Sequence, residues 1–198
     1  MKYGRLVLSI FFSISFVNFG NASEKKLTLD DFTPYLTPEF ISGSVREIAA
    51  KIDADYLGKE VTLVCVLKGA LVFTADLMRA MKTSTQLECI HTSSYGDKEI
   101  AGQLTLRGLE NVCLKDQEVI VVDDIYDTGN TMEKLKQEFL KQQPKSLKTC
   151  VFLLKNVKRV DDRKPDYYAV EIENKWVQGY GLDSNEKFRG LPGIWAKK

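Results

Sequence analysis

Residues 119–132 constrain the fold of this chain more than any other segment. Four apolar residues, Val119 to Val122, come first and are followed by acidic and then small polar residues. Such a run is typical of a strand that is buried on both faces of a parallel sheet. From Met132 to Phe139 the apolar residues take the spacing of an amphipathic helix. We therefore predict a strand, a loop and a helix, the kind of corner at which open α/β sheets bind ligands.

The loop of this corner has the composition of a phosphate-binding site. A glycine-containing loop at the start of a helix presents backbone N–H groups and the positive end of a dipole to an anion. The loop residues are Asp127, Thr128, Gly129, Asn130 and Thr131. Asp123 and Asp124, just before them, would repel a bare phosphate, but they suit a ligand that also brings hydroxyl groups or a divalent metal ion. A sugar phosphate bound with Mg²⁺ meets both conditions.

Three other interpretations compete with this one. A P-loop nucleotidase would need the pattern Gly-x-x-x-x-Gly-Lys-Ser/Thr, which the segment lacks. The acidic pair after a strand resembles that of response-regulator receivers, but there the pair sits near the start of the chain. A strand end with aspartate and threonine as helix caps accounts for any single one of these residues.

The composition indicates one globular domain without a nucleic-acid partner. The chain of 198 residues is long enough for a full core, and 44% of its residues are hydrophobic. Lys and Arg together number 28 and Asp and Glu 27, which gives a net charge of +1. A dedicated nucleic-acid-binding protein usually shows a basic excess.

Residues 1–22 have the layout of a secretory signal peptide. Two basic residues precede the apolar stretch 6–17, and small residues follow it. The stretch is short for a membrane span, which takes about 20 residues, so we expect no stable membrane partner. We take 1–22 as a targeting segment outside a single domain at 23–198. Export, an uncleaved signal and a gene start placed too far upstream remain open.

The rest of the chain alternates helices and strands. Residues 23–37 are polar and interrupted by proline, which predicts an irregular arm, and 94–114 predict a long loop. The apolar spacing predicts helices over 42–56 and 70–81, and strands over 61–67, 87–93 and 147–154.

Four further residues could contact a ligand at strand ends or beyond. The amides of Lys68 and Gly69 lie at a second strand-to-helix corner and could receive another anion. Lys155 ends a strand and could either extend to solvent or donate to a carbonyl oxygen. Trp176 offers a flat face for stacking a base, unless it is a core residue.

Three motifs carry a resemblance to a known family. Residues 123–131 resemble the loop that binds 5-phosphoribosyl 1-pyrophosphate (PRPP) in type I phosphoribosyltransferases, in the form used by hypoxanthine-guanine enzymes. Residues 66–70, Val-Leu-Lys-Gly-Ala, are similar to the pyrophosphate loop of that group, in which the Leu-Lys peptide is often cis. Residues 164–191 are similar to its C-terminal hood. The resemblance spans about residues 40–191.

The resemblance implies how PRPP and Mg²⁺ would be bound. Asp123 and Asp124 would hold the ribose hydroxyls, and residues 127–131 would hold the 5′-phosphate. The pyrophosphate would be bound by Lys68, Gly69 and Arg189. The Mg²⁺ ligands would be Asp183 and Asp123.

The resemblance also implies a site for a 6-oxopurine base. Its residues would be Lys155, Trp176, Val177 and Asp183. Asp127 would be the catalytic residue, exchanging a proton with N7 of the purine, and Ser94 and Tyr95 would begin a lid over PRPP. Three positions depart from the family pattern: Asp123 replaces a common Glu, Tyr126 an aliphatic residue and Gly190 an Asp.

The implied fold is α/β, with a central, mostly parallel sheet flanked by helices and a small hood from both termini, beginning at about residue 164. The implied reaction is Mg²⁺-dependent transfer of the phosphoribosyl group from PRPP to N9 of hypoxanthine and guanine, giving IMP or GMP and pyrophosphate, in a homodimer or homotetramer. Because PRPP is a cytosolic metabolite, we expect a cytoplasmic protein, with export as the alternative. A non-catalytic regulator that senses PRPP or a nucleotide, and an enzyme preferring xanthine, are the other hypotheses.

Overall fold

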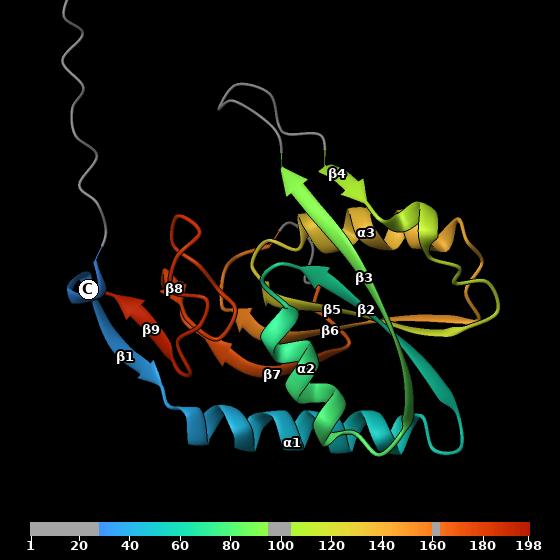
Figure 1. The fold of residues 1–198 in the computed structure, drawn as a ribbon, viewed down its shortest axis with the longest axis horizontal. Coiled ribbons are helices and arrows are strands. Elements are labelled where there is room, and N and C mark those ends of the chain that lie inside the picture. Colours follow the sequence, from blue (N-terminus) through green and yellow to red (C-terminus); the bar gives the residue numbers. More distant parts are fainter. Residues whose placement is uncertain (1–27, 95–103, 160–162) are drawn as a thin grey trace, which may run out of the picture.

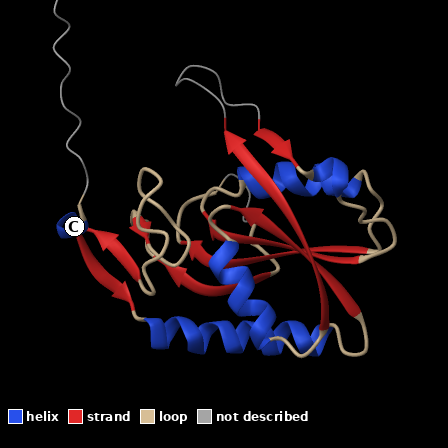
Figure 2. Cartoon of the chain, in the orientation of Figure 1, coloured by secondary structure: helices blue, strands red, loops and turns tan. Residues whose placement is uncertain are grey.

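The computed structural model describes residues 28–94, 104–159 and 163–198, which form two β-sheets of unequal size (Figures 1 and 2). The larger sheet has six strands and carries helices on both faces (Figure 1). The smaller sheet has three strands and contains segments from both ends of the described chain. The α/β fold with a hood from both termini is confirmed.

The six-stranded sheet has the order β4-β3-β2-β5-β6-β7. Its strands are β2 (Glu60–Leu67), β3 (Ser84–Ser94), β4 (Leu104–Arg107), β5 (Glu118–Tyr126), β6 (Ser146–Lys155) and β7 (Tyr167–Ile172). Neighbouring strands are parallel except β3 and β4. From β2 the chain first adds β3 on one side and later β5 on the other. The topological switch of the sheet therefore lies between β2 and β5, where ligands bind in open α/β sheets.

Helices cover both faces of this sheet (Figure 1). Helices α1 (Pro38–Asp55) and α2 (Leu71–Ala80) lie on one face, and α3 (Asn130–Leu140) lies on the other. Successive residues of β5 alternate between the two cores, since Ile120 packs with the α1 and α2 side chains and Val121 with those of α3. The predicted strand buried on both faces is thus confirmed.

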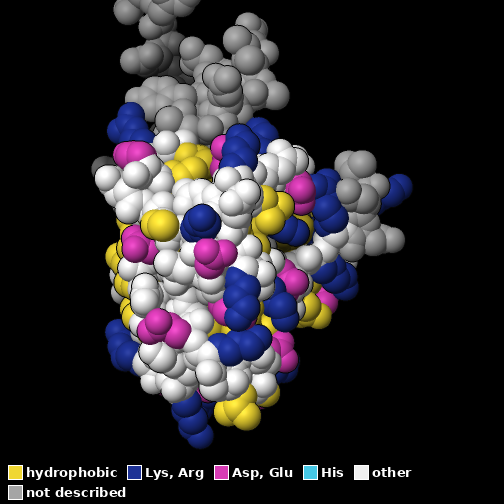
Figure 3. All heavy atoms as spheres, turned by 90° about the vertical axis from the view of Figure 1, so that its right-hand side faces the viewer, with side chains coloured by type: hydrophobic (Ala, Val, Ile, Leu, Met, Phe, Trp, Pro, Cys, Tyr) yellow, Lys and Arg dark blue, Asp and Glu magenta, His cyan; other side chains and the backbone are white. Residues whose placement is uncertain are grey.

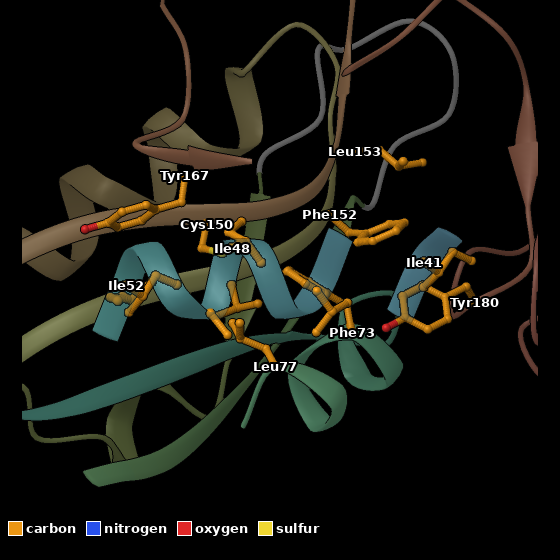
Figure 4. Close-up of a cluster of buried hydrophobic side chains, with 14 of the residues drawn as sticks. Ile41, Ile48, Ile52, Phe73, Leu77, Cys150, Phe152, Leu153, Tyr167 and Tyr180 are labelled. Carbon is orange, nitrogen blue, oxygen red and sulfur yellow. The ribbon is translucent and has the colours of Figure 1, made fainter. Parts of the chain in front are cut away.

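The core on the α1 and α2 face continues into the hood. Phe73 of α2 lies 5.3 Å from Phe152 of β6, and Phe152 lies 4.9 Å from Tyr180 of the hood, measured between ring centroids (Figure 4). Both phenylalanines are fully buried and Tyr180 is 5% exposed. One aromatic cluster therefore connects a helix, the central sheet and the hood.

The hood sheet has the order β1-β9-β8, with antiparallel neighbours. Its strands are β1 (Phe32–Leu36), β8 (Val177–Gln178) and β9 (Ile194–Lys197). The predicted irregular arm over 23–37 was wrong for β1 and for the short 3₁₀ helix η1 (Leu29–Asp31) before it. Pro34 is tolerated in β1 because this strand is at the edge of the sheet.

Other boundaries differ from the prediction. Helix α1 begins at Pro38 and not at residue 42, because Thr37 accepts a hydrogen bond from the N–H of Phe40 (3.3 Å) and proline is favoured in the first turn. Strand β7 belongs to the six-stranded sheet, so the hood strands after the central sheet start only at Val177. The stretch 94–114, predicted as a loop, contains β4 and the 3₁₀ helix η2 (Leu109–Asn111).

Two predictions fall outside the described residues. These are the targeting segment 1–22 and most of the proposed start of the lid, of which only Ser94 is described, as the last residue of β3.

No helix in the described ranges is both long and apolar enough to cross a membrane. Basic and acidic side chains are interspersed on the face shown in Figure 3, and ion pairs such as Lys59 and Lys145 with Glu118 (3.4 and 3.1 Å) occur at the amino ends of the strands.

Candidate active site

A cavity of about 360 Å³ lies at the carboxyl ends of β2 and β5, at the switch point of the sheet. It brings together residues from four separate parts of the chain. Those predicted to bind PRPP and Mg²⁺ that line it are Lys68, Gly69, Asp123, Asp124, Asp127, Thr128, Gly129, Asn130, Thr131, Asp183 and Arg189. Both predicted corners thus face one cavity.

The loop between β5 and α3 has the backbone geometry of an anion cradle. Gly129 precedes the helix with φ of +84°, a conformation that favours glycine, and a Cβ there would overlap the hydroxyl of Tyr126. Among the described side chains none caps the start of α3. The first N–H groups of the helix, which have no partner within it, belong to residues 130–132, and these residues line the cavity.

The acidic pair lies on β5 itself, because the strand continues to Tyr126 beyond the predicted apolar run. The N–H of Asp124 donates to Oδ1 of Asp123 (2.9 Å). Burial among protein atoms, with the neighbouring charge of Asp124 as a second cause, raises the pKa of Asp123 well above its usual range. Burial also raises the pKa of Asp124. A ligand that offers hydroxyl protons or a cation to this pair would relieve the unfavourable burial of charge.

At the second corner the peptide bond between Leu67 and Lys68 is cis, as the resemblance implied. Gly69 follows with its backbone directly against the side chain of Asp124, so that a Cβ at Gly69 would overlap the carboxylate. Lys68 Nζ donates to Oε2 of Glu186 in the hood (3.0 Å). The corner is therefore in contact with both β5 and the hood.

The hood contributes a cluster of charges to the cavity. Arg189 Nη2 lies 2.8 Å from Oδ1 of Asp183 and 3.3 Å from Oε2 of Glu186, and Nη1 donates to the carbonyl of Gly181 (2.9 Å). The N–H of Glu186 donates to the other carboxylate oxygen of Asp183 (2.8 Å). Both oxygens of Asp183 thus have partners, and Arg189 is held in a fixed orientation.

Of the residues predicted to bind the base, Asp183 lines the cavity and the other three do not. Lys155 Nζ lies 3.0 Å from Oδ2 of Asp127, and the side chain of Lys155 is only 12% exposed, so it does not extend to solvent. Trp176 is 59% exposed, which excludes the interpretation as a core residue. Val177 is buried in β8, and neither it nor Trp176 lines the cavity. Their contact with a base stays a prediction.

Sequence reasoning missed three residues of this region. Thr92 of β3 lines the cavity, Glu186 contacts both predicted pyrophosphate-binding cations, and Arg159 contacts the backbone of Asp127. Only Glu186 carried a signal, since it is an acidic residue between Asp183 and Arg189. The other two are placed by the packing of strands and loops.

The carboxylates of the cavity suit Mg²⁺ that arrives with a phosphorylated ligand. The described residues contain no group of three or more potential ligand side chains that could hold a metal ion by themselves. Mg²⁺ usually binds one or two carboxylates and takes its other ligands from water and substrate phosphates. Asp123, Asp124 and Asp183, which line the cavity, meet that requirement.

Comparisons with known proteins agree with this geometry. The family model described as phosphoribosyl transferase domain matches residues 38–185. The chain is 38% identical over 162 residues to the hypoxanthine-guanine phosphoribosyltransferase of Aquifex aeolicus, covering 81% of this chain and 91% of that protein. It is 35% identical over 159 residues to the hypoxanthine-guanine-xanthine phosphoribosyltransferase of Tritrichomonas foetus, covering 80% and 87%.

A solved structure gives the same result at the level of the fold. The crystal structure of a hypoxanthine-guanine phosphoribosyltransferase from Bacillus anthracis matches with a TM-score of 0.78 and 37% identity, covering 84% of this chain and 98% of that one. These matches extend over most of this chain and nearly all of the relatives. This chain therefore belongs to the phosphoribosyl transferase family, in the group of the hypoxanthine-guanine phosphoribosyltransferases.

Proposed function

We propose that this protein transfers the 5-phosphoribosyl group of PRPP to N9 of hypoxanthine and of guanine, releasing pyrophosphate and giving IMP or GMP. One observation carries the proposal: a phosphate-type loop, a buried acidic pair and two cations line a single cavity, next to the paired side chains of Lys155 and Asp127. A molecule with a phosphate at one end, hydroxyls in the middle and a pyrophosphate at the other end fits this order of groups.

In the proposed complex, residues 127–131 bind the 5′-phosphate through backbone N–H groups at the start of α3. Asp123 and Asp124 accept hydrogen bonds from the ribose hydroxyls. Because burial raises the pKa of both carboxyls, these hydrogen bonds also offset the cost of holding negative charge there.

Lys68, Gly69 and Arg189 bind the leaving pyrophosphate and stabilise the charge that builds up on it. Glu186 has to release Lys68 and Arg189 for this to happen, since it contacts both (3.0 and 3.3 Å). Mg²⁺, when bound with the pyrophosphate and Asp183 or Asp123, supplies further neutralisation of that charge. Arg189 remains oriented by its hydrogen bond to the carbonyl of Gly181.

Lys155 and Asp127 recognise and activate the base. The ammonium of Lys155 donates to O6 of a 6-oxopurine, a contact that the amino group of adenine would not accept. Asp127 takes the proton from N7 of the purine as N9 forms its bond to C1′ of the ribose and the bond between C1′ and pyrophosphate breaks. Trp176, exposed on the hood, stacks on the ring. In the structure Lys155 and Asp127 pair with each other, so the base would insert between two groups that are already oriented (3.0 Å).

Steady-state assays with hypoxanthine, guanine, xanthine and adenine, each with PRPP and Mg²⁺, test this function. We expect transfer to hypoxanthine and guanine and none to adenine, and loss of transfer when Mg²⁺ is chelated. Xanthine is included because one relative is named as accepting it. Binding of PRPP without transfer to any base would instead identify a non-catalytic sensor, and transfer to adenine would contradict the role of Lys155.

We propose that the protein works in the cytoplasm, where PRPP is available, as a homodimer or homotetramer. Cell fractionation with N-terminal sequencing and light scattering measure both properties. A mature protein that begins at Ser23 in the cell envelope would contradict the cytoplasmic placement.

A further inference from the structure

One arginine joins the ends of two neighbouring strands of the central sheet. The last residue pair of the β5–β6 ladder is Tyr126 with Leu154. The residues that follow this pair along the chain are Asp127 and Lys155. Their carbonyl oxygens both accept hydrogen bonds from Arg159: Nε donates to Asp127 (3.0 Å) and Nη2 to Lys155. The side chain of Arg159 thereby links the ends of β5 and β6 by hydrogen bonds beyond their last backbone pair.

The guanidinium of Arg159 also contacts an aromatic ring below the phosphate loop. Its Cζ lies 5.3 Å from the ring centroid of Tyr126, within the range of a cation–π contact. Tyr126 is 5% exposed, and its hydroxyl fills the space that a Cβ on Gly129 would occupy. The ring therefore connects Arg159 to the turn that opens α3, at a position where the family pattern has an aliphatic residue.

The two residues whose carbonyls Arg159 holds are also the two whose side chains meet. Lys155 Nζ and Asp127 Oδ2 are 3.0 Å apart, and both side chains extend from the backbone segments that Arg159 links. Because a side chain can point only where its own backbone directs it, a shift of either strand end would change this separation. Reactions that depend on oriented groups lose rate steeply when such a separation changes.

We propose that Arg159 is a positioning residue that fixes the distance and orientation between the Asp127 carboxylate and the Lys155 ammonium, with Tyr126 as its support. The predicted effect on turnover rests on the proposed function. The structural link between the two strand ends does not depend on that function. An arginine suits this task because its planar guanidinium donates in two diverging directions at once, whereas a lysine presents one point charge.

The test uses Arg159→Met and Arg159→Lys, with Lys158→Met as the control that removes an exposed positive charge one residue away. We expect kcat/KM to fall by about 100-fold in both Arg159 variants, with a lower kcat and a higher KM for PRPP and base. We expect Lys158→Met to behave like the wild type. Pyrophosphate binding, measured by calorimetry, should stay within about twofold of wild type, since Arg159 contacts Asp127, Lys155 and Tyr126 at the ends of β5 and β6 and not the corner that holds Lys68.

A residue that only stabilises the fold would give a different result. It would lower the melting temperature and the active fraction but leave the KM of the folded fraction unchanged. Wild-type KM and kcat per folded molecule in Arg159→Met, or full recovery in Arg159→Lys, would overturn the proposal. If Arg159→Met does not fold, Tyr126→Leu keeps both hydrogen bonds and removes the ring, and we expect it to raise the KM for PRPP several-fold.

Amide hydrogen exchange separates this inference from the proposed function. We expect the peptide covering residues 125–132 to exchange faster in Arg159→Met than in the wild type and in Lys158→Met. That readout needs no turnover, so it stands even if the wild type transfers nothing to any purine. Equal exchange in all three proteins would show that Arg159 does not hold the two strand ends.

Discussion

The ammonium of Lys68 lies 3.0 Å from the carboxylate of Glu186, although 118 positions separate them in the sequence. Glu186 also lies 3.3 Å from Nη2 of Arg189. Hydrogen bonds from Lys68 and Arg189 lower the pKa of Glu186. A carboxylate of the protein thus neutralises both cations that we assign to the pyrophosphate.

Replacing Glu186 by Gln should strengthen pyrophosphate binding, because the two cations then lose an internal competitor. We expect a decrease in the dissociation constant of roughly two- to fivefold, the scale of an exposed ion pair. Calorimetric titration with magnesium pyrophosphate measures it. Glu138→Gln, which removes an exposed ion pair with Lys141 on α3, is the control and should change nothing. Weaker binding in Glu186→Gln would mean that Glu186 helps to orient the cations.

Replacing Asp127 by Asn should separate binding from chemistry. The amide can still accept from Lys155, whose Nζ lies 3.0 Å from the carboxylate, but it cannot exchange a proton with a purine. We expect kcat to fall by about 10²–10⁴-fold, with PRPP affinity within a few-fold of wild type. Stopped-flow kinetics and PRPP titration check the two quantities. Asp116→Asn, in a turn at the amino end of β5, is the control, and unchanged turnover in Asp127→Asn would remove this residue from the chemistry.

Replacing Asp123 by Asn should stabilise the fold in a pH-dependent way. Burial raises the pKa of Asp123, so the folded state holds this proton more tightly than the unfolded state, and the wild type loses stability as the pH rises through the raised pKa. The variant cannot ionise and avoids this loss. Its melting temperature should exceed that of the wild type at pH 8, by roughly 2–4 °C for each kcal/mol gained, and the difference should shrink toward pH 4.

Calorimetric scans of Asp123→Asn and wild type across this pH range provide the measurement. A difference that grows on acidification would have the wrong sign for a carboxyl with a raised pKa. Turnover should fall in the same variant, because the ribose hydroxyls lose a charged acceptor.

Replacing Gly69 by Ala should damage the site and leave the fold intact. The added Cβ would overlap the carboxylate of Asp124, which has to move away from the cavity. We expect kcat/KM to fall by about 100-fold, the loss typical of an active-site group that is displaced by about 1 Å. Gly190→Ala is the matched control, since nothing lies within 4 Å of a Cβ there. Equal activity of the two variants would show that the position of Asp124 is not important.

Replacing Phe152 by Ala should destabilise the sheet and the hood together. Its fully buried ring lies 5.3 Å from Phe73 and 4.9 Å from Tyr180. We expect a loss of about 3–5 kcal/mol in the free energy of unfolding, measured by urea denaturation. Phe152→Leu, which leaves a smaller cavity, should lose less. A near-neutral Phe152→Ala would mean that the hood does not depend on this cluster.

Local patterns predicted the parts of the fold that are continuous in sequence. The apolar run before Asp123, the loop 127–131 and the helix after it form one strand, loop and helix, and the corner at Lys68 repeats this arrangement. Both corners could be assigned to one ligand because parallel strands end at the same edge of a sheet. The periodicity of apolar residues and the composition of a turn depend on neighbours a few positions away, so the sequence displays them directly.

Pairing between distant segments could not be seen in this way. Phe32 to Leu36 form a strand only because Ile194 to Lys197 pair with them at the other end of the chain. Long-range contacts likewise decide which residues surround the site: Glu186 contacts Lys68, and Arg159 donates to the carbonyls of Asp127 and Lys155. The sequence by itself determined the chemistry available at each strand end. Only the tertiary structure decided which of those groups touch, because contact energies between distant residues are realised only after the sheet has brought its strand ends together.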